Sequence, residues 1–428
     1  MKWGGYPECR DSGVPWIGSV PSHWQVERVK DIASIINGFP FDAARFSTDL
    51  GHPLVRIRDL NSDTTEARFN GDFVDSAAIT SSDVLIGMDG DFNIGRWRGH
   101  GAALLNQRMC CLRGHSKSTA DALAYALAFP LKAINDITYS TTVKHLSSYQ
   151  IAKIRVAVPP HDELHAILRF LDSETAKLDA MITKQQRLIE LLQEKRQVVI
   201  SHAVTKGLNP NAPMKDSGVD WLGAVPAHWE VLPTKRLFRL VVEPAPSDNQ
   251  YELLSIYTDI GVRPRRELEE KGNKASTTDG YFRVKKRDFI VNKLLAWMGA
   301  IGLSQYDGVT SPAYDILRAR RSLDERYFDY LWRCGICFTE FRRHSRGIMD
   351  MRLRLYFEDF GQLLMPYPPE HEQRSIVEAL LVQTAQIDTL VAKSQRSIDL
   401  MFEHRSALIF AAVTGKIDVR DSTNTLAA

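Results

Sequence analysis

Two long segments of the chain, 159–205 and 368–414, place aliphatic residues at alternating steps of four and three positions. This spacing is the a/d pattern of a coiled coil, and each segment keeps it for more than five heptads. The first predicted seam holds Leu164, Leu168, Leu171, Leu178, Ile182, Ile189, Leu192 and Val199. The second holds Val377, Leu380, Ile387, Val391, Ile398, Met401 and Leu408. Two ordinary amphipathic helices on globular cores are the alternative, although about 45 residues exceeds the usual length of such helices.

The long segments belong to a unit that occurs twice in the chain. Residues 11–26 return as 216–231, with eleven of sixteen positions identical at an offset of 205. The long segments repeat at an offset of 209. A motif, a variable region and a long helix therefore follow one another twice. The predicted parts are a globular region with its motif at 1–158, a helix at 159–205, a linker and second motif at 206–231, a second globular region at 232–367, a helix at 368–414 and a tail at 415–428.

The short linker predicts how the two helices run. Only about ten residues, 206–215, separate the first helix from the second motif, so the second helix must run back along the first. We expect an antiparallel coiled coil with a globular region at each end and an internal pseudo-twofold axis. Outward-facing apolar residues such as Ile167, Leu191 and Phe402 would suit a partner protein.

The two variable regions have the pattern of α/β or α+β domains. Short β-rich runs occur at 53–58, 84–86 and 109–112, and helical runs at 120–129 and 325–333. The second region carries four extra residues near its end, within 345–354. A length difference between paired copies indicates a loop, and loops often carry function.

Composition excludes several classes of protein. Lys and Arg number 54 against 52 acidic residues, so a basic surface would have to come from local clusters. Five cysteines suit a reducing cytoplasm. The apolar runs are short for a membrane span, and the N-terminus lacks the apolar core of a signal peptide, so we expect a cytoplasmic protein without a membrane role.

The sequence offers no catalytic constellation and no convincing metal site. His161 and His165 are one helical turn apart, but the acidic residue of a zinc-protease motif is missing, so a solvated first turn is the better interpretation. Cys334 and Cys337 stand alone as a CxxC pair and are read as structural. Neither a phosphate-binding P-loop nor an amino-methyltransferase tetrad occurs.

Local basic clusters are the positive signal, because arginine, asparagine and glutamine read base edges and cations hold phosphates. The candidates in the second region are Lys293, Arg342, Arg343, Arg346, Arg352 and Arg354, with 346, 352 and 354 on the inserted loop. Those in the first region are Arg56, Arg58, Arg96, Trp97, Arg98, Asn106, Gln107, Arg108 and Lys144. Any one cluster could be a solvated face, but recurrence in two paired regions matches the twofold nature of duplex DNA.

The chain resembles the specificity subunit of type I restriction-modification systems over its whole length. The resemblance rests on the paired motifs at 11–24 and 216–229. It also rests on the Pro-Pro pairs that precede the two long helices at 159 and 368, and on the Ala-Val-Thr sequences that end those helices at 203–205 and 412–414. The runs 291–299 with 311–314, and 88–93 with 106–108, also resemble the recognition domains of that family.

The resemblance implies a DNA-reading subunit without catalysis of its own. Each variable region would be a target recognition domain that reads half of a bipartite site in double-stranded DNA. The helices would set the spacing and dock two methyltransferase (modification) subunits, which restriction/translocase subunits would join. S-adenosylmethionine, ATP and Mg would be used by those partners, with no cofactor in this chain. A fused enzyme that reads and modifies DNA, or a coiled-coil adaptor without DNA contact, stay open as alternatives.

Overall fold

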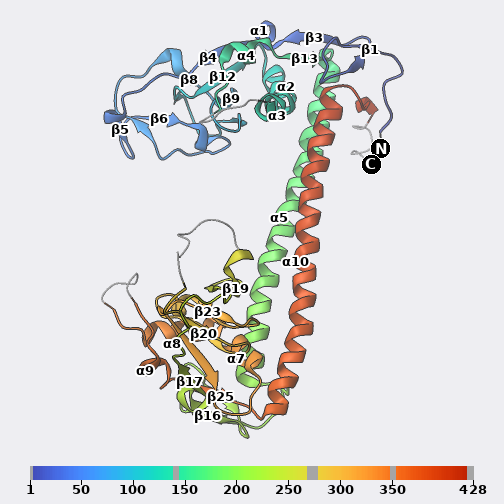
Figure 1. Cartoon of the computed structure of the whole chain (residues 1–428). Coiled ribbons are helices and arrows are strands. Elements are labelled where there is room, and N and C mark those ends of the chain that lie inside the picture. The colour runs from blue at the N-terminus through green and yellow to red at the C-terminus, as the bar shows by residue number, and fades with distance from the viewer. Residues whose placement is uncertain (1–2, 138–143, 268–277, 348–352, 422–428) are drawn as a thin grey trace. The chain divides into compact units, whose positions relative to one another are not determined.

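The computed structural model describes residues 3–137, 144–267, 278–347 and 353–421 (Figure 1). These form two compact units, unit 1 with residues 1–185 and 397–428, and unit 2 with residues 186–396. The division crosses the two long helices, α5 (His161–Lys206) and α10 (Glu370–Val413), so each unit contains one globular region and a part of both helices. Mixed α/β regions joined to two long antiparallel helices confirm the predicted fold class.

The globular region of unit 1, which we call the first region (residues 27–158), contains two small sheets. One has the order β10 (Ile94–Arg96), β9 (Val84–Gly87), β12 (Met109–Gly114) and β4 (Ala33–Asn37). The other has the order β5 (Phe46–Ser47), β7 (Arg68–Phe69), β6 (His52–Val55), β11 (Ala103–Leu105) and β8 (Ala78–Ile79). The helices are α1 (Val29–Ile32), α2 (Lys117–Ala126), α3 (Ala128–Ile137) and α4 (Ser148–Lys153). Strand β3 (Gln25–Arg28) pairs with β13 (Arg155–Val158), which leads into α5.

The globular region of unit 2, the second region (residues 232–367), repeats the first of these sheets. Its order is β17 (Phe238–Val241), β24 (Tyr314–Ala319), β21 (Phe289–Asn292) and β22 (Ile301–Leu303). Hairpin β18 (Leu254–Tyr257) with β19 (Gly261–Pro264), and the pair β20 (Phe282–Val284) with β23 (Gly308–Thr310), complete the strands. The helices are α6 (Thr234–Leu237), α7 (Glu325–Trp332), α8 (Gly335–Arg343) and α9 (Phe357–Phe360). Strand β16 (Glu230–Pro233) pairs with β25 (Leu364–Tyr367) before α10.

One predicted strand ends early. The run 53–58 was expected to be extended throughout, but β6 stops at Val55 and a 3-10 turn follows at Ile57–Asp59. Asp59 causes the turn, because its carboxylate accepts a hydrogen bond from the backbone N–H of Arg56 at 2.9 Å. Arg56 and Arg58 therefore lie in a turn and not on a strand.

The antiparallel direction of the helices is visible inside each unit. In unit 1, Asp179 of α5 bonds Arg405 of α10 at 3.1 Å, and the earlier Leu171 packs with the later Ala412. In unit 2, Arg196 bonds Asp388 at 3.1 Å, and the later Val204 packs in one cluster with the earlier Val377. Residue numbers rise along one helix as they fall along the other, as the short linker predicts.

All the predicted seam residues are buried or half-buried in both helices. Leu171, Val377 and Leu380 are fully enclosed, whereas Leu178, Ile189 and Val391 near the middle are half-buried. The remaining seam residues, which are also buried or half-buried, are Leu164, Leu168, Ile182, Leu192, Val199, Ile387, Ile398, Met401 and Leu408. Helix α10 contains a stretch with a mean hydropathy of 1.2, apolar enough for a membrane span by length and composition alone, of which 28% is buried.

The prediction that Ile167 faces outward is wrong. Ile167 is buried, since Trp24 and Phe170 of unit 1 cover it in the same apolar cluster. Leu191 and Phe402 are exposed as expected. The heptad positions alone could not show that the segment around the first motif folds over this face of α5.

Each sequence motif forms a hairpin at the helix ends of its own unit. The hairpins are β1 (Cys9–Asp11) with β2 (Ser19–Pro21), and β14 (Met214–Asp216) with β15 (Ala224–Pro226). His23 contacts Glu163 in the first turn of α5 at 2.8 Å, and His228 contacts Glu372 in the first turn of α10 at the same distance. Trp24 and Trp229 are buried. The repeated motif is therefore a structural junction that joins one helix start to one helix end.

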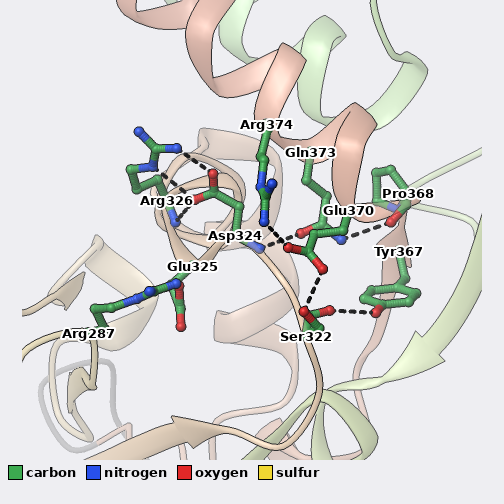
Figure 2. A network of polar contacts seen from close by, with 10 residues as sticks. All are labelled: Arg287, Ser322, Asp324, Glu325, Arg326, Tyr367, Pro368, Glu370, Gln373 and Arg374. Carbon is green, nitrogen blue, oxygen red and sulfur yellow. Dashed lines mark hydrogen bonds and ion pairs between the residues drawn. The ribbon is translucent and has the colours of Figure 1, made fainter.

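Unit 2 has a polar network that the matching positions of unit 1 lack (Figure 2). Ser322 donates to Glu370 of α10, and Glu370 also pairs with Arg374. Gln373 accepts a hydrogen bond from the backbone of Asp324 at 2.9 Å, just before α7 begins. In unit 1 the positions of Glu370 and Arg374 hold His161 and His165, so the first turn of α5 is not bound in this way.

Candidate nucleic-acid interface

The central strands of both regions are held by the same ion pair. In the first region Arg113 of β12 donates two hydrogen bonds to the buried Asp83, at 2.9 and 2.7 Å. In the second region Arg318 of β24 donates two bonds of 2.7 Å to the buried Asp288. The hydrogen bonds that Arg318 donates to Asp288 and Glu243 raise the pKa of its guanidinium. The two aspartates are 205 residues apart in the sequence, and so are the two arginines. Each aspartate directly precedes a central strand, β9 or β21, and the candidate loop of that region follows the other end of the strand.

In the first region, the loop after β9 carries a compact charged cluster. Asp89 accepts from Arg108 at 2.6 Å and contacts His145 at 2.8 Å. Although burial by itself raises the pKa of Asp89, the hydrogen bonds from His145 and Arg108 outweigh it and hold that pKa below its usual range. Lys144 donates to the backbone and side-chain oxygens of Asn135 at 2.6 and 3.0 Å. Arg108 and Lys144 thus lie beside one loop, with Asp89 between Arg108 and His145.

Several first-region candidates are engaged inside the fold. Arg56 is half-buried and pairs with Asp59 at 3.3 Å, and Arg96 pairs with Asp121 at 2.5 Å. The prediction that Trp97 binds DNA is wrong, because Trp97 is buried in an apolar cluster with Val55 and cannot stack on a base from there. The exposed candidates are Arg58, Arg98, Gln107 and Arg108, with Asn106 half-buried.

In the second region, the candidate arginines surround the end of α8. Arg343 pairs with Glu340 at 3.0 Å, and the guanidinium of Arg342 lies 5.4 Å from the ring centre of Trp297. Arg346 and Arg354 face each other through two backbone hydrogen bonds of 2.9 Å. Both are exposed, and Arg346 also pairs with Asp359 of α9 at 2.6 Å.

Lys293 and Arg352 complete the set of second-region candidates. Lys293 is half-buried and pairs with Asp315 at 3.2 Å, which leaves it less available than the arginines. Its carbonyl accepts from the backbone of Leu355 at 2.9 Å, so the loop after β21 lies next to the Arg346–Arg354 bridge. Arg352 lies outside the described residues.

The histidine and cysteine pairs do not build a metal centre. His161 and His165 approach to 3.2 Å on the surface of α5, and no group of three or more metal-ligand side chains occurs in the part of the chain that the structure describes. Cys334 and Cys337 are both buried as free cysteines, and burial raises the pKa of the Cys337 thiol. A buried, protonated thiol is unreactive, which agrees with a structural role.

Sequence reasoning missed two kinds of functional neighbour. It overlooked Asp89, which pairs with Arg108 and contacts His145, and it overlooked Arg113 and Arg318, which bind the aspartates of the central strands. The constant offset of 205 between Asp83 and Asp288 was a usable signal, since the arginines repeat at the same offset. No such signal marks the Asp89 cluster, because its members come from three separate segments of the sequence.

Comparison with known proteins agrees with this architecture. The family model for the type I restriction modification DNA specificity domain matches residues 21–192. The EcoBI specificity subunit of Escherichia coli is 26% identical over 96% of this chain and 90% of its own length. The putative MjaX specificity subunit of Methanocaldococcus jannaschii is 21% identical over 94% of this chain and 96% of its own length.

Two solved structures share the fold. The HsdS subunit from Thermoanaerobacter tengcongensis aligns with a TM-score of 0.52 and 13% identity, covering 93% of this chain and 98% of that one. A chain from a study of complex assembly and conformational transition in a type I R-M system aligns with a TM-score of 0.63 and 15% identity, covering 92% and 98%. Family model, whole-length relatives and fold agree, and the chain is similar over nearly its whole length to the specificity subunits of type I restriction-modification systems.

Proposed function

We propose that the chain is the DNA-reading subunit of its restriction-modification complex, with one half of a bipartite site read by each globular region. One observation carries the proposal: the two regions share a framework, the four-stranded sheet with its Asp–Arg pair, but differ in the loops that extend from it. The same four-stranded sheet and the same pair of a buried aspartate with an arginine occur in both regions. The loops beyond them differ, with Asp89 and Arg108 in one region and the arginines around α8 in the other. A constant scaffold with variable basic loops suits two readers of different base sequences.

The helices are the proposed docking surface for two modification subunits. Several large apolar side chains of α5 and α10 outside the seam are exposed, among them Leu188, Leu191, Val198, Leu381, Val382 and Phe402. Such residues on a long helix pair are suited to burial against a protein partner. Restriction/translocase subunits would join that assembly, and the complex would act in the cytoplasm without a membrane role.

Catalysis is assigned to those partners. Methyl transfer with S-adenosylmethionine, and ATP- and Mg-dependent translocation and cleavage, would take place on the modification and restriction subunits. This chain would supply only the choice and spacing of the DNA site. Purified chain that transferred methyl groups by itself would favour the fused-enzyme alternative.

Genome-wide mapping of methylated bases tests the proposal. Cells that carry this chain with its partners should show one bipartite methylated sequence with an unspecified spacer. Arg354→Ala should relax or abolish recognition in one half only, while Arg58→Ala and Arg98→Ala should act on the other half. A contiguous methylated sequence, or a site that none of these variants changes, would contradict the proposal and favour the adaptor without DNA contact.

A further inference from the structure

The loop after β21 in the second region, residues 293–299, is held rigidly in place. The backbone N–H of Leu294 donates to Asn292 Oδ1 at 3.1 Å, and the indole of Trp297 donates to the carbonyl of Leu294 at 3.0 Å. Gly299 ends the loop with φ +96°, and a Cβ there would lie 2.8 Å from the ring of Phe338. The loop therefore has a fixed conformation in the free protein, packed against α8.

This rigid loop presents three large apolar side chains to solvent. Leu294, Leu295 and Met298 are 40%, 41% and 49% exposed. A single exposed leucine is ordinary in a folded protein, but three within five residues form a patch that usually binds something. We call these three residues the apolar patch.

Cationic groups border the apolar patch. Lys293 precedes it directly, and Arg342 lies over Trp297, the residue before Met298. The backbone bond from Leu355 to Lys293 brings the neighbouring Arg354 next to the same loop. Apolar side chains bordered by cations complement a duplex, which offers apolar base faces between anionic phosphates.

The matching loop of the first region, residues 88–94, has no such patch. Asp89 occupies the position that matches Leu294, and its carboxylate is bound by Arg108 and His145. Phe92 occupies the position that matches Trp297 and is buried. The patch is therefore a property of the second region, and it is not required by the shared framework.

We propose that the apolar patch is a wedge that inserts beside a base step of the second half-site and partly unstacks it. This inference rests on the proposed DNA-reading function and adds a mode of reading by deformability, because flexible pyrimidine–purine steps open most easily. Proteins that kink DNA insert leucine or methionine side chains in this way. The rigid loop lowers the entropic cost of insertion, since its conformation is set before binding.

Permanganate footprinting of the assembled complex on its mapped site tests the wedge. Permanganate oxidises unstacked thymines, so the wild-type complex should make one or two thymines hyperreactive in the second half-site only. The double variant Leu294→Ala/Leu295→Ala should return them to the reactivity of free duplex and weaken specific binding on the order of tenfold, comparable with one mismatched base pair. Ile260→Ala is the matched control, because Ile260 is 42% exposed in the same region but lies on the β18–β19 turn.

The outcomes separate the wedge from the proposed function. Specific binding without hyperreactive thymines, and with full affinity in the double variant, would overturn the wedge and leave DNA reading intact. Absence of specific DNA binding by the wild-type complex would overturn both. A double variant that binds DNA normally but loses its modification subunits would also overturn the wedge, and would identify the patch as a protein-docking surface.

Discussion

The first and second regions have the same sheet but opposite chemistry at the loop that follows its central strand. After β9, Asp89 carries a negative charge that pairs with Arg108 and contacts His145. After β21, the matching loop presents Leu294 and Leu295, and its cations come from α8 and the Arg346–Arg354 bridge. The shared parts are those that must pack on the helices, whereas the parts that differ face outward. This division is expected if packing constrains one set of residues and DNA sequence the other.

Loss of the buried carboxylate should be the largest effect, and it should be similar in both regions. Asp83→Ala and Asp288→Ala each remove two hydrogen bonds from an arginine and one from a backbone N–H, at Thr80 and at Lys285. The arginine left behind is partly exposed and can be hydrated, so the free energy of unfolding of each unit should fall by about 2–4 kcal/mol. Glu358→Ala, at an exposed carboxylate of α9, is the control and should change it by less than about 0.5 kcal/mol. Hydrogen exchange on each unit measures this. A large effect in one region only would break the idea of a shared framework.

The helix seam should behave alike in the two units. Leu171→Ala in unit 1 and Leu380→Ala in unit 2 each remove a fully enclosed side chain and should cost about 3 kcal/mol of unfolding free energy. Leu381→Ala is a close control for the second change, because Leu381 is the next residue on α10 and is 48% exposed, against 1% for Leu380. Denaturant unfolding followed by hydrogen exchange separates the units. Equal costs for Leu380 and Leu381 would contradict the assigned seam.

Much of this framework could be predicted from the sequence, because repetition and heptad spacing are local, periodic signals. The seam from Leu164 to Leu408, the antiparallel direction and the paired motifs all followed from counting positions. The outer surfaces could not be predicted in the same way. Trp97 and Arg96 are adjacent in sequence, yet one is buried in the core and the other pairs with Asp121. Burial of Ile167 depends on a segment more than a hundred residues away.

Variants of the candidate DNA-reading arginines should each affect one half-site only, unlike the framework variants, whose effects should be alike in both regions. Arg354→Ala should cost about 1–3 kcal/mol of binding to the cognate site if Arg354 reads a base, and should alter the second half-site only. Arg108→Ala should act on the first half-site only. Competition binding with duplexes altered in one half measures both. An arginine variant that changed both halves equally would indicate a phosphate contact or a loss of assembly.

The smallest expected effect concerns the negative charge that only the first loop carries. Asp89→Asn removes the charge that neutralises Arg108, so nonspecific DNA binding should strengthen and its salt dependence should steepen by about one unit of slope. The pKa of Asp89 is already below its usual range, so Asp89 itself stays charged between pH 6 and 8. Leu294→Asn, at the matching position of the second loop, should leave the salt slope unchanged.

A chain with two copies of one region tests the central claim most directly. Residues 27–158 are replaced by residues 232–367, joined at the repeated boundaries Val26/Val231 and Pro159/Pro368. The methylated bases are then mapped in cells that also carry the partner subunits. If each region reads one half-site, the new chain should direct methylation to an inverted repeat of the second half-site around an unspecified spacer. Methylation of the original asymmetric site, or of a site unrelated to either half, would contradict the account.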